Sequence, residues 1–175
     1  MLPHCSHGAH HSEQAMPLNE LLSAERVVIL ATPLDRRGVL DAAADLLAGP
    51  PGAASAQPAM ADAISSSLQH RERLASTAIG HGVAIPHGRI QGIEHTRGVF
   101  LRLLEPADFG AADGIPVDLV LAMAVPEYFV QEHLQQLAEL AECFADPEFR
   151  ARLRRADLTG LRRCLLGGDA HRSAA

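Results

Sequence analysis

The sequence contains no lysine and no tryptophan, and several other features are scarce. All 15 basic residues are therefore arginines, and the formal net charge of −6 argues against general nucleic-acid binding. Aromatic residues make up only 3% of the chain, so a hydrophobic core has to be built from Ala, Leu, Val and Ile. No apolar run is long enough to span a bilayer, and the N-terminus lacks the pattern of a signal peptide. We therefore expect neither a nucleic-acid partner nor membrane insertion.

Cysteine is also sparse. Cys5, Cys143 and Cys164 are isolated from one another, with no CxxC spacing. An odd, scattered set of this kind fits a reducing compartment better than a disulfide framework. The sequence thus predicts a cytoplasmic protein.

The 175 residues, 47% of them hydrophobic, are enough for one domain with one sizeable core. We expect a flexible tail over residues 1–15, a domain over 16–166 and a frayed end over 167–175. The first tail holds four histidines beside Cys5, a set that can bind a transition metal. Its spacing matches no fixed zinc pattern, so we interpret it as an unstructured end of biased composition and expect no metal site.

Strands and helices alternate along the predicted domain, which indicates a single α/β domain. The segment 117–125 is almost wholly apolar, so it belongs in the middle of a sheet covered on both sides. The arginines after Asp146-Pro147 are interpreted as a solvated basic helix face. The expected strands are 27–30, 97–104 and 117–125, and the expected helical segments are 18–22, 37–47, 58–70, 130–145, one after Asp146, and 157–166.

The most unusual stretch is residues 76–90, STAIGHGVAIPHGRI. Its three glycines allow sharp backbone turns around the short apolar run 83–85, which favours a strand. Pro86 is expected to end that strand, which leaves His87 at a strand end with Gly88 keeping its surroundings open. A titratable group in such a position can meet a substrate or a partner. From the residues alone, a functional and a structural role for His87 both stay open.

This stretch, with several segments downstream of it, resembles the enzyme IIA components of the bacterial phosphoenolpyruvate-dependent phosphotransferase system. The similarity is to the fructose/mannitol class, and within it to the nitrogen-regulatory branch. It covers about residues 16–166 and implies a mixed central β-sheet flanked by helices on both faces. The residues that carry it are Ser76-Thr77, Gly80, residues 82–89 (GVAIPHGR), residues 98–100 (GVF), residues 116–119 (PVDL), Val125-Pro126, His133-Leu134 and Leu137-Ala138.

The resemblance implies a phosphoryl-transfer site. His87 would be the phosphoryl acceptor, with His133 as the active-site histidine that faces it. An arginine at the place of Arg71 would lie beside the phosphohistidine, where a guanidinium forms two parallel hydrogen bonds to phosphoryl oxygens. Without the resemblance, Arg71, Glu72 and Arg73 would be interpreted as a solvated helix end; Arg73 is a weaker candidate than Arg71.

Further support for the phosphoryl group is expected from the Ser76 and Thr77 hydroxyls and from backbone amides near Gly88. From the residues alone, Ser76 and Thr77 are instead turn residues. A neutral imidazole suits the transfer because one ring nitrogen carries a lone pair while a hydrogen bond to the other fixes the tautomer. This chemistry requires no cofactor, and we predict none.

One residue departs from the family pattern. His81 stands between two glycines, where the family usually has asparagine. Asparagine tolerates a left-handed backbone, and His81 is expected to fill the same backbone role. The alternative is that His81 acts as a second titratable group and alters the pH dependence of transfer.

The leading hypothesis is a phosphocarrier that receives its phosphoryl group from a phosphohistidine carrier protein (HPr-like or NPr-like) and regulates partner proteins. The length leaves no room for a fused permease domain, which favours the nitrogen-regulatory branch. A sugar-specific component that passes phosphate to a separate IIB domain is the near alternative. A regulatory binding module that no longer transfers phosphate is a third hypothesis. A metal-dependent enzyme ranks last, because no helix carries an HExxH pattern.

Overall fold

The structure is a computed structural model that describes residues 18–49, 58–128 and 130–167, without the side chains of residues 130–133. The predicted N-terminal tail lies outside these ranges, as does most of the predicted C-terminal tail. Among the described residues, no helix is long and apolar enough to cross a membrane.

The described chain forms one six-stranded mixed sheet with the strand order β1-β5-β6-β3-β2, and β4 also pairs with β6. The pairs β1–β5, β3–β6 and β4–β6 are parallel, whereas β5–β6 and β2–β3 are antiparallel. The strands are β1 (Val27–Leu30), β2 (Ala78–Gly80), β3 (Val83–Ala84), β4 (His87–Ile90), β5 (Arg97–Ala107) and β6 (Val117–Pro126).

The central strand is β6, and each of its residues except Asp118 is buried. This confirms the expectation that an apolar run covered on both faces lies in the middle of the sheet. The expected end of β5 before Glu105 is wrong, because the strand continues to Ala107. Its pairing with β6 shifts between Arg102 and Ala107, so Pro106, which has no N–H to donate, falls outside the regular ladder.

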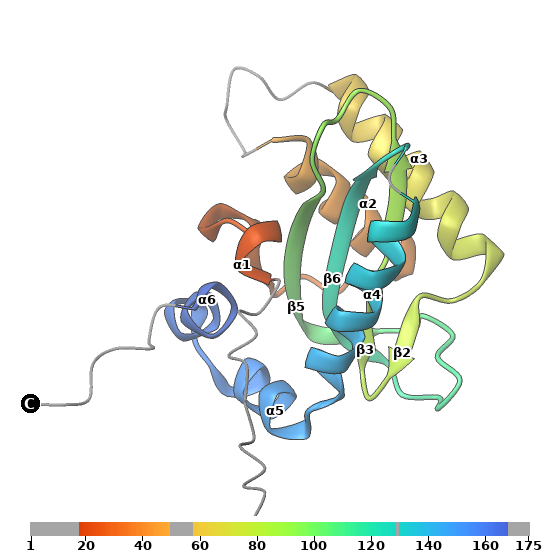
Figure 1. The fold of residues 1–175 in the computed structure, drawn as a ribbon. Coiled ribbons are helices and arrows are strands. Elements are labelled where there is room, and N and C mark those ends of the chain that lie inside the picture. Colours follow the sequence, from red (N-terminus) through yellow and green to blue (C-terminus); the bar gives the residue numbers. More distant parts are fainter. Residues whose placement is uncertain (1–17, 50–57, 129, 168–175) are drawn as a thin grey trace, which may run out of the picture.

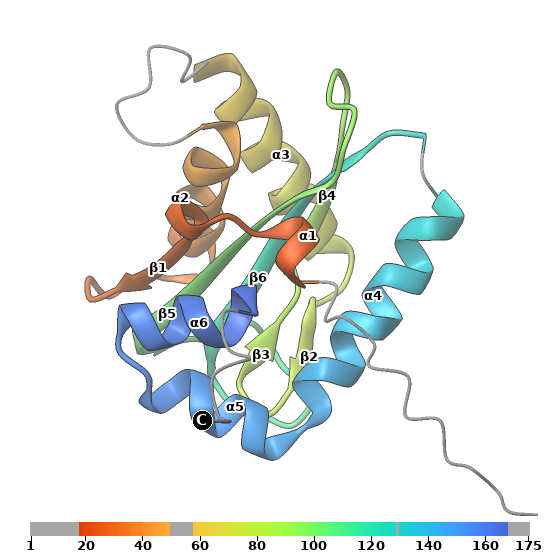
Figure 2. The ribbon, with the colours of Figure 1, turned by 60° about the vertical axis from the view of Figure 1, so that its left-hand side comes forward.

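Helices cover both faces of the sheet (Figures 1 and 2), which confirms the predicted α/β class. The helices α2 and α3 pack on one face over a core that includes Leu40, Leu68 and Val120. The other helices enclose a second core on the opposite face, where the Phe100 and Phe144 rings stack with centroids 6.3 Å apart. The helices are α1 (Leu18–Leu21), η1 (a 3₁₀ turn, Ala24–Arg26), α2 (Arg36–Ala48), α3 (Pro58–Leu74), α4 (Val130–Ala145), α5 (Pro147–Arg155) and α6 (Leu158–Leu166).

Three aspartates cap the helices that follow them. The side chain of Asp35 accepts a hydrogen bond from the Gly38 amide at the start of α2, and Asp146 accepts one from the Glu148 amide at the start of α5. Asp157 caps α6 in the same way. Each cap satisfies an amide that has no partner within its helix, so the helix starts are determined locally.

The solvated basic face expected on α5 is wrong for Arg150, whereas Arg154 is exposed as expected but is held in an ion pair. Arg150 is buried and donates to the carbonyl oxygens of Phe144 (2.7 Å) and Ala145 (2.8 Å) at the end of α4. Arg154 places two nitrogens on the two carboxylate oxygens of Asp118, each at 2.8 Å. These arginines satisfy free carbonyls and a β6 carboxylate, and thereby attach α5 to the rest of the fold.

Candidate functional site

The turn between β2 and β3 has three consecutive residues with positive φ: Gly80 (93°), His81 (56°) and Gly82 (77°). His81 is the one non-glycine residue with positive φ in the described part of the chain. Its amide donates to Asp113 Oδ2 at 2.7 Å, and its carbonyl accepts from Arg154 Nη2 at 2.6 Å. His81 therefore has the left-handed backbone that the sequence comparison with asparagine predicted.

Pro86 interrupts a strand without ending its path along the sheet. β3 stops at Ala84, as expected before a proline, but β4 begins at His87 and pairs with the same neighbour, β6. The Pro86 carbonyl accepts from the Met123 amide at 2.8 Å, which keeps the chain on β6 across the gap. His87 consequently opens a strand within a rigid sheet, rather than following the end of one.

The hydrogen bonds of His87 define its tautomer. Nδ1 lies 2.9 Å from the Ile85 carbonyl oxygen. Because a carbonyl only accepts, Nδ1 carries the proton, and Nε2 keeps its lone pair. The Nε–H of Arg71 points at that lone pair, with 3.2 Å between the two nitrogens.

The electrostatic surroundings keep this imidazole neutral. Burial is the largest effect and lowers the pKa of His87 below its ordinary 6.5, and the positive charge of Arg71 lowers it further. The hydrogen bond to Ile85 and the negative charge of Glu72 act in the opposite direction but are outweighed. At neutral pH, His87 is therefore an uncharged group with a lone pair on Nε2.

Arg71 reaches His87 because α3 approaches β4 closely. A Cβ on Gly88 would lie 2.6 Å from Ser67 Oγ and 2.9 Å from Ser67 Cβ. Ser67 in turn donates to the Arg89 carbonyl at 3.0 Å. The expectation that Gly88 leaves open space around His87 is wrong. The space that a side chain at position 88 would need is occupied by α3, which carries Arg71 in its last turn.

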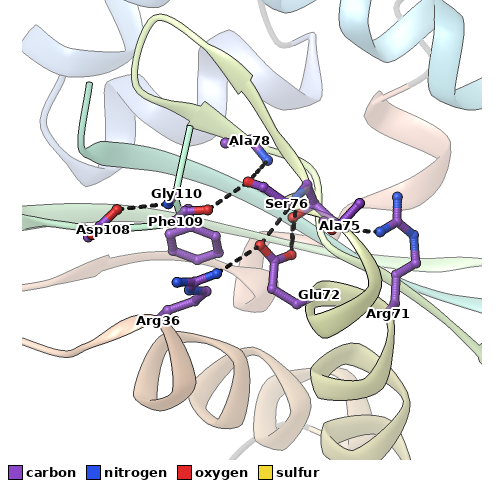
Figure 3. A network of polar contacts seen from close by, with 10 residues as sticks. Arg36, Arg71, Glu72, Ala75, Ser76, Ala78, Asp108, Phe109 and Gly110 are labelled. Carbon is purple, nitrogen blue, oxygen red and sulfur yellow. Dashed lines mark hydrogen bonds and ion pairs between the residues drawn. The ribbon is translucent and has the colours of Figure 1, made fainter. Parts of the chain in front are cut away.

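The hydroxyls of Ser76 and Thr77 are both hydrogen-bonded at the turn after α3, and Figure 3 shows Ser76 and Glu72 in this network. Ser76 Oγ donates to the Phe109 carbonyl at 2.6 Å and accepts from the Ala78 amide at 3.1 Å. Thr77 Oγ1 donates to Glu72 Oε2 at 2.5 Å. Both residues thus hold the turn together, and their support of a phosphoryl group stays a prediction, as does that of the Gly88 amide.

His133 and Arg73 complete the predicted set. His133 lies in the first turn of α4, but its side chain is outside the described part of the structure, so its facing His87 stays a prediction. Arg73 is exposed at the end of α3. It lines a cleft of about 430 Å³ with Asp35, Arg36, Arg37, Gln69, Glu72 and Asp108.

Sequence reasoning missed Glu72, which it assigned to a solvated helix end. Only 5% of Glu72 is exposed, and its carboxylate faces the turn that precedes β2. The available signal was periodicity, because Ile64, Leu68 and Glu72 recur at four-residue spacing on one side of α3 and all three are buried.

The described residues contain no group of three or more His, Cys, Asp or Glu side chains that could hold a metal ion. The histidines near the N-terminus lie outside those residues. The groups that meet at His87 are a neutral imidazole and the guanidinium of Arg71.

Comparison with known proteins identifies the family to which the chain belongs. The model of the family described as "Phosphoenolpyruvate-dependent sugar phosphotransferase system, EIIA 2" matches residues 20–159. The chain belongs to this family, whose members take part in phosphoryl transfer through phosphohistidine.

Similar proteins within the family carry nitrogen-regulatory names. A nitrogen regulatory protein of Pseudomonas aeruginosa is 36% identical over 139 residues, which are 79% of this chain and 87% of that protein. One of Bradyrhizobium diazoefficiens is 45% identical over 87 residues, but the match covers 50% of this chain and little more than half, 57%, of that protein. The crystal structure of nitrogen regulatory protein IIA-Ntr from Neisseria meningitidis superposes with a TM-score of 0.72 at 34% identity, covering 85% of this chain and 98% of that one.

Proposed function

We propose that this chain is a cytoplasmic phosphocarrier of the nitrogen-regulatory type, which accepts a phosphoryl group on His87 Nε2. The donor is the phosphohistidine of a small HPr-like or NPr-like carrier, and the phosphorylation state decides which regulatory target is bound. The observation that carries the proposal is the tautomer of His87: Nδ1 donates to the Ile85 carbonyl while Nε2 presents its lone pair next to Arg71. A neutral imidazole in this state is a nucleophile that needs no prior loss of a proton.

In the proposed step, the Nε2 lone pair forms a bond to phosphorus as the N–P bond of the donor breaks. The electron pair of that bond returns to the donor imidazole. Positive charge develops on the His87 ring, and the Ile85 carbonyl stabilises it through Nδ1–H. The transferring group carries negative charge on its oxygens, and Arg71 is the cation next to the accepting atom.

Arg71 must release Nε2 before the bond forms, because its Nε–H occupies the lone pair in the unphosphorylated protein. The freed guanidinium then donates to two phosphoryl oxygens, a geometry for which its planar fork is suited. His133 is the second imidazole proposed to face the phosphoryl group.

The test is phosphorylation of the full chain by phosphoenolpyruvate, enzyme I and an HPr-like or NPr-like carrier. We expect an acid-labile, alkali-stable phosphoryl group on the wild type and none on His87→Ala. His95→Ala is the matched control, because His95 is exposed and its removal leaves labelling unchanged. Label that persists in His87→Ala, or a wild type that stays unlabelled with every carrier, contradicts the proposal.

A second measurement separates the nitrogen-regulatory type from the sugar-specific alternative. The phosphorylated chain is mixed with purified fructose- and mannitol-type IIB domains, and the label is followed. Retention of the label on this chain, with partner proteins that bind one phosphorylation state and not the other, is the expected result. Rapid transfer of the label to a IIB domain would assign the chain to sugar transport instead.

A further inference from the structure

A buried carboxylate lies next to Arg71 in the sequence and organises the turn that leads to His87. Glu72 is 5% exposed, and its oxygens accept from the Thr77 amide (3.2 Å to each oxygen) and from Thr77 Oγ1 (2.5 Å). Arg36 Nη1 lies 3.9 Å from Glu72 Oε1. Figure 3 shows this ion pair beside the hydrogen bonds of the turn. A glutamate is rarely buried unless its charge is paired and hydrogen-bonded, and here both conditions are met.

The contacts continue from Glu72 to the imidazole through the backbone. Thr77, which Glu72 holds by its amide and hydroxyl, accepts at its carbonyl from the Ile85 amide at 3.0 Å. The Ile85 carbonyl then accepts from His87 Nδ1 at 2.9 Å. Three hydrogen bonds join Thr77 to Glu72 and one forms each later link, and together they determine where the acceptor for Nδ1–H lies.

The same turn also holds the arginine. Arg71 Nη1 donates to the Ala75 carbonyl at 2.8 Å, while its Nε donates to His87 Nε2. Ala75 lies between Glu72 and Thr77, so the segment that Glu72 closes carries the carbonyl that orients Arg71. The positions of the guanidinium and of the imidazole therefore depend on one buried carboxylate.

We propose that Glu72 is a positioning residue for phosphoryl transfer: it fixes the turn that keeps the proton of His87 on Nδ1 and the lone pair on Nε2. The inference rests on the proposed function for its catalytic consequence, but the tautomer itself is a property of the unphosphorylated protein. A carboxylate that merely stabilised the fold would leave the tautomer of a folded variant unchanged. That difference provides the test.

The experiment uses the full chain labelled with ¹⁵N-histidine and reads the protonation of each His87 nitrogen by two-dimensional NMR. Glu72→Met retains length and removes both acceptors, whereas Glu72→Gln retains one acceptor oxygen. Asp41→Asn is the matched control. Like Glu72, Asp41 is a carboxylate that accepts a hydrogen bond from a hydroxyl, but it lies on α2 and its partner is Ser65 of α3. We expect the Nδ1–H form to dominate in the wild type and in Asp41→Asn, to weaken in Glu72→Gln, and to weaken most in Glu72→Met.

Transfer from the phosphorylated carrier is measured on the same variants. Misplacing a reacting group by about 1 Å costs up to roughly a hundredfold in rate, so we expect Glu72→Met to be slower by about tenfold to a hundredfold. Loss of the Nδ1–H preference and slower transfer should appear together, because the Nε2–H form has no lone pair at the accepting atom.

Thr77 provides a second pair of variants if Glu72→Met does not fold. Thr77→Val removes the hydroxyl at nearly constant shape, and Thr77→Ser restores it. We expect Thr77→Val to weaken the Nδ1–H form of His87, as Glu72→Met does, and Thr77→Ser to retain it. If Thr77→Val instead slowed transfer with an unchanged tautomer, its hydroxyl would act on the phosphoryl group directly and the positioning proposal would be overturned.

An unchanged tautomer in folded Glu72→Met would also overturn the proposal. Failure of the wild type to accept phosphate would reject the proposed function, while the tautomer series would still decide whether Glu72 positions His87.

Discussion

Arg71 Nε and His87 Nε2 lie 3.2 Å apart in a hydrogen bond that joins the end of α3 to the first residue of β4. The bond is possible because Nδ1 of the same ring donates to the Ile85 carbonyl, which leaves Nε2 as the acceptor. The imidazole is thus held at both nitrogens, by Arg71 of α3 and by Ile85 in the connection between β3 and β4. The proposed accepting atom, Nε2, is thereby defined in the unphosphorylated protein.

Substitution of Arg71 should separate the effect of its charge from that of its geometry. The positive charge of Arg71 lowers the pKa of His87, so Arg71→Gln should raise that pKa relative to wild type. Arg71→Lys keeps the charge and loses the planar fork, so the pKa should change less while phosphoryl transfer still slows by about tenfold or more. Histidine NMR titration and single-turnover transfer measure the two quantities. Wild-type transfer by Arg71→Lys would show that the fork is not required.

The pH dependence of His87 follows from its burial. Its pKa in the folded chain lies below the ordinary 6.5, so the ring should stay neutral, and transfer should stay fast, as the pH falls somewhat below 6.5. An NMR titration that gave a midpoint at or above 6.5 would contradict this.

The lowered pKa of His87 also makes the stability of the fold depend on pH. The unfolded chain takes up the proton of His87 near pH 6.5 and the folded chain only at lower pH, so the unfolded state binds more protons between the two values. The stabilisation is fully present above 6.5 and is lost as the pH falls through the folded pKa. Urea unfolding at several pH values should show this slope in wild type and less of it in His87→Gln. If the unfolding free energy depended on pH equally in both proteins, His87 would not be the source of that dependence.

Gly88→Ala should destabilise the fold and impair transfer. The added Cβ would meet Ser67 Oγ at 2.6 Å and the Leu68 amide nitrogen at 3.1 Å, so α3 has to move away from β4. Overpacking of this kind costs about 1–3 kcal/mol of unfolding free energy. Because α3 carries Arg71, slower phosphoryl transfer should accompany the loss.

A double variant tests this explanation. Ser67→Ala removes the hydroxyl that the new Cβ would meet first, so Gly88→Ala/Ser67→Ala should recover part of the transfer rate. No recovery, or a Gly88→Ala protein as stable and active as wild type, would show that the close packing does not position Arg71.

His81 should be replaceable by asparagine but not by valine. Its recorded hydrogen bonds, to Asp113 and from Arg154, use its backbone atoms. His81→Asn should therefore leave stability within about 0.5 kcal/mol and the pH profile of transfer unchanged. His81→Val places a β-branched residue at a φ of 56° and should cost about 1–2 kcal/mol. A pH profile that shifts in His81→Asn would instead assign His81 an electrostatic role.

The parts of the fold with local signals were predictable from the sequence. The capping aspartates Asp35 and Asp146 determine where their helices start through hydrogen bonds within the first turn. The apolar run of β6 predicts a central strand. His87 was identified from a glycine-rich motif and a resemblance rather than from its contacts. The left-handed conformation of His81 was likewise predictable, because it is required by the turn itself.

The remaining features depend on contacts between distant segments. Nothing local shows that Gly88 faces Ser67 of α3, or that Arg154 meets Asp118 of β6, and both were assigned to open or solvated surroundings. Glu72 was missed because a charged residue between two arginines has the composition of a helix end. Its partner, Thr77, lies beyond a turn whose path the sequence does not reveal.

The most direct test is the chemical identity of the phosphohistidine in the intact phosphorylated chain. The hydrogen bond from Nδ1 to Ile85 and the lone pair of Nε2 predict that phosphorus is bonded to Nε2 of His87. Nitrogen-15 and phosphorus-31 NMR of ¹⁵N-histidine protein resolves the two isomers through one-bond coupling. Coupling to Nε2 of His87 is the expected result. A phosphoryl group on Nδ1 of His87, or on any other histidine, would contradict the account of this site.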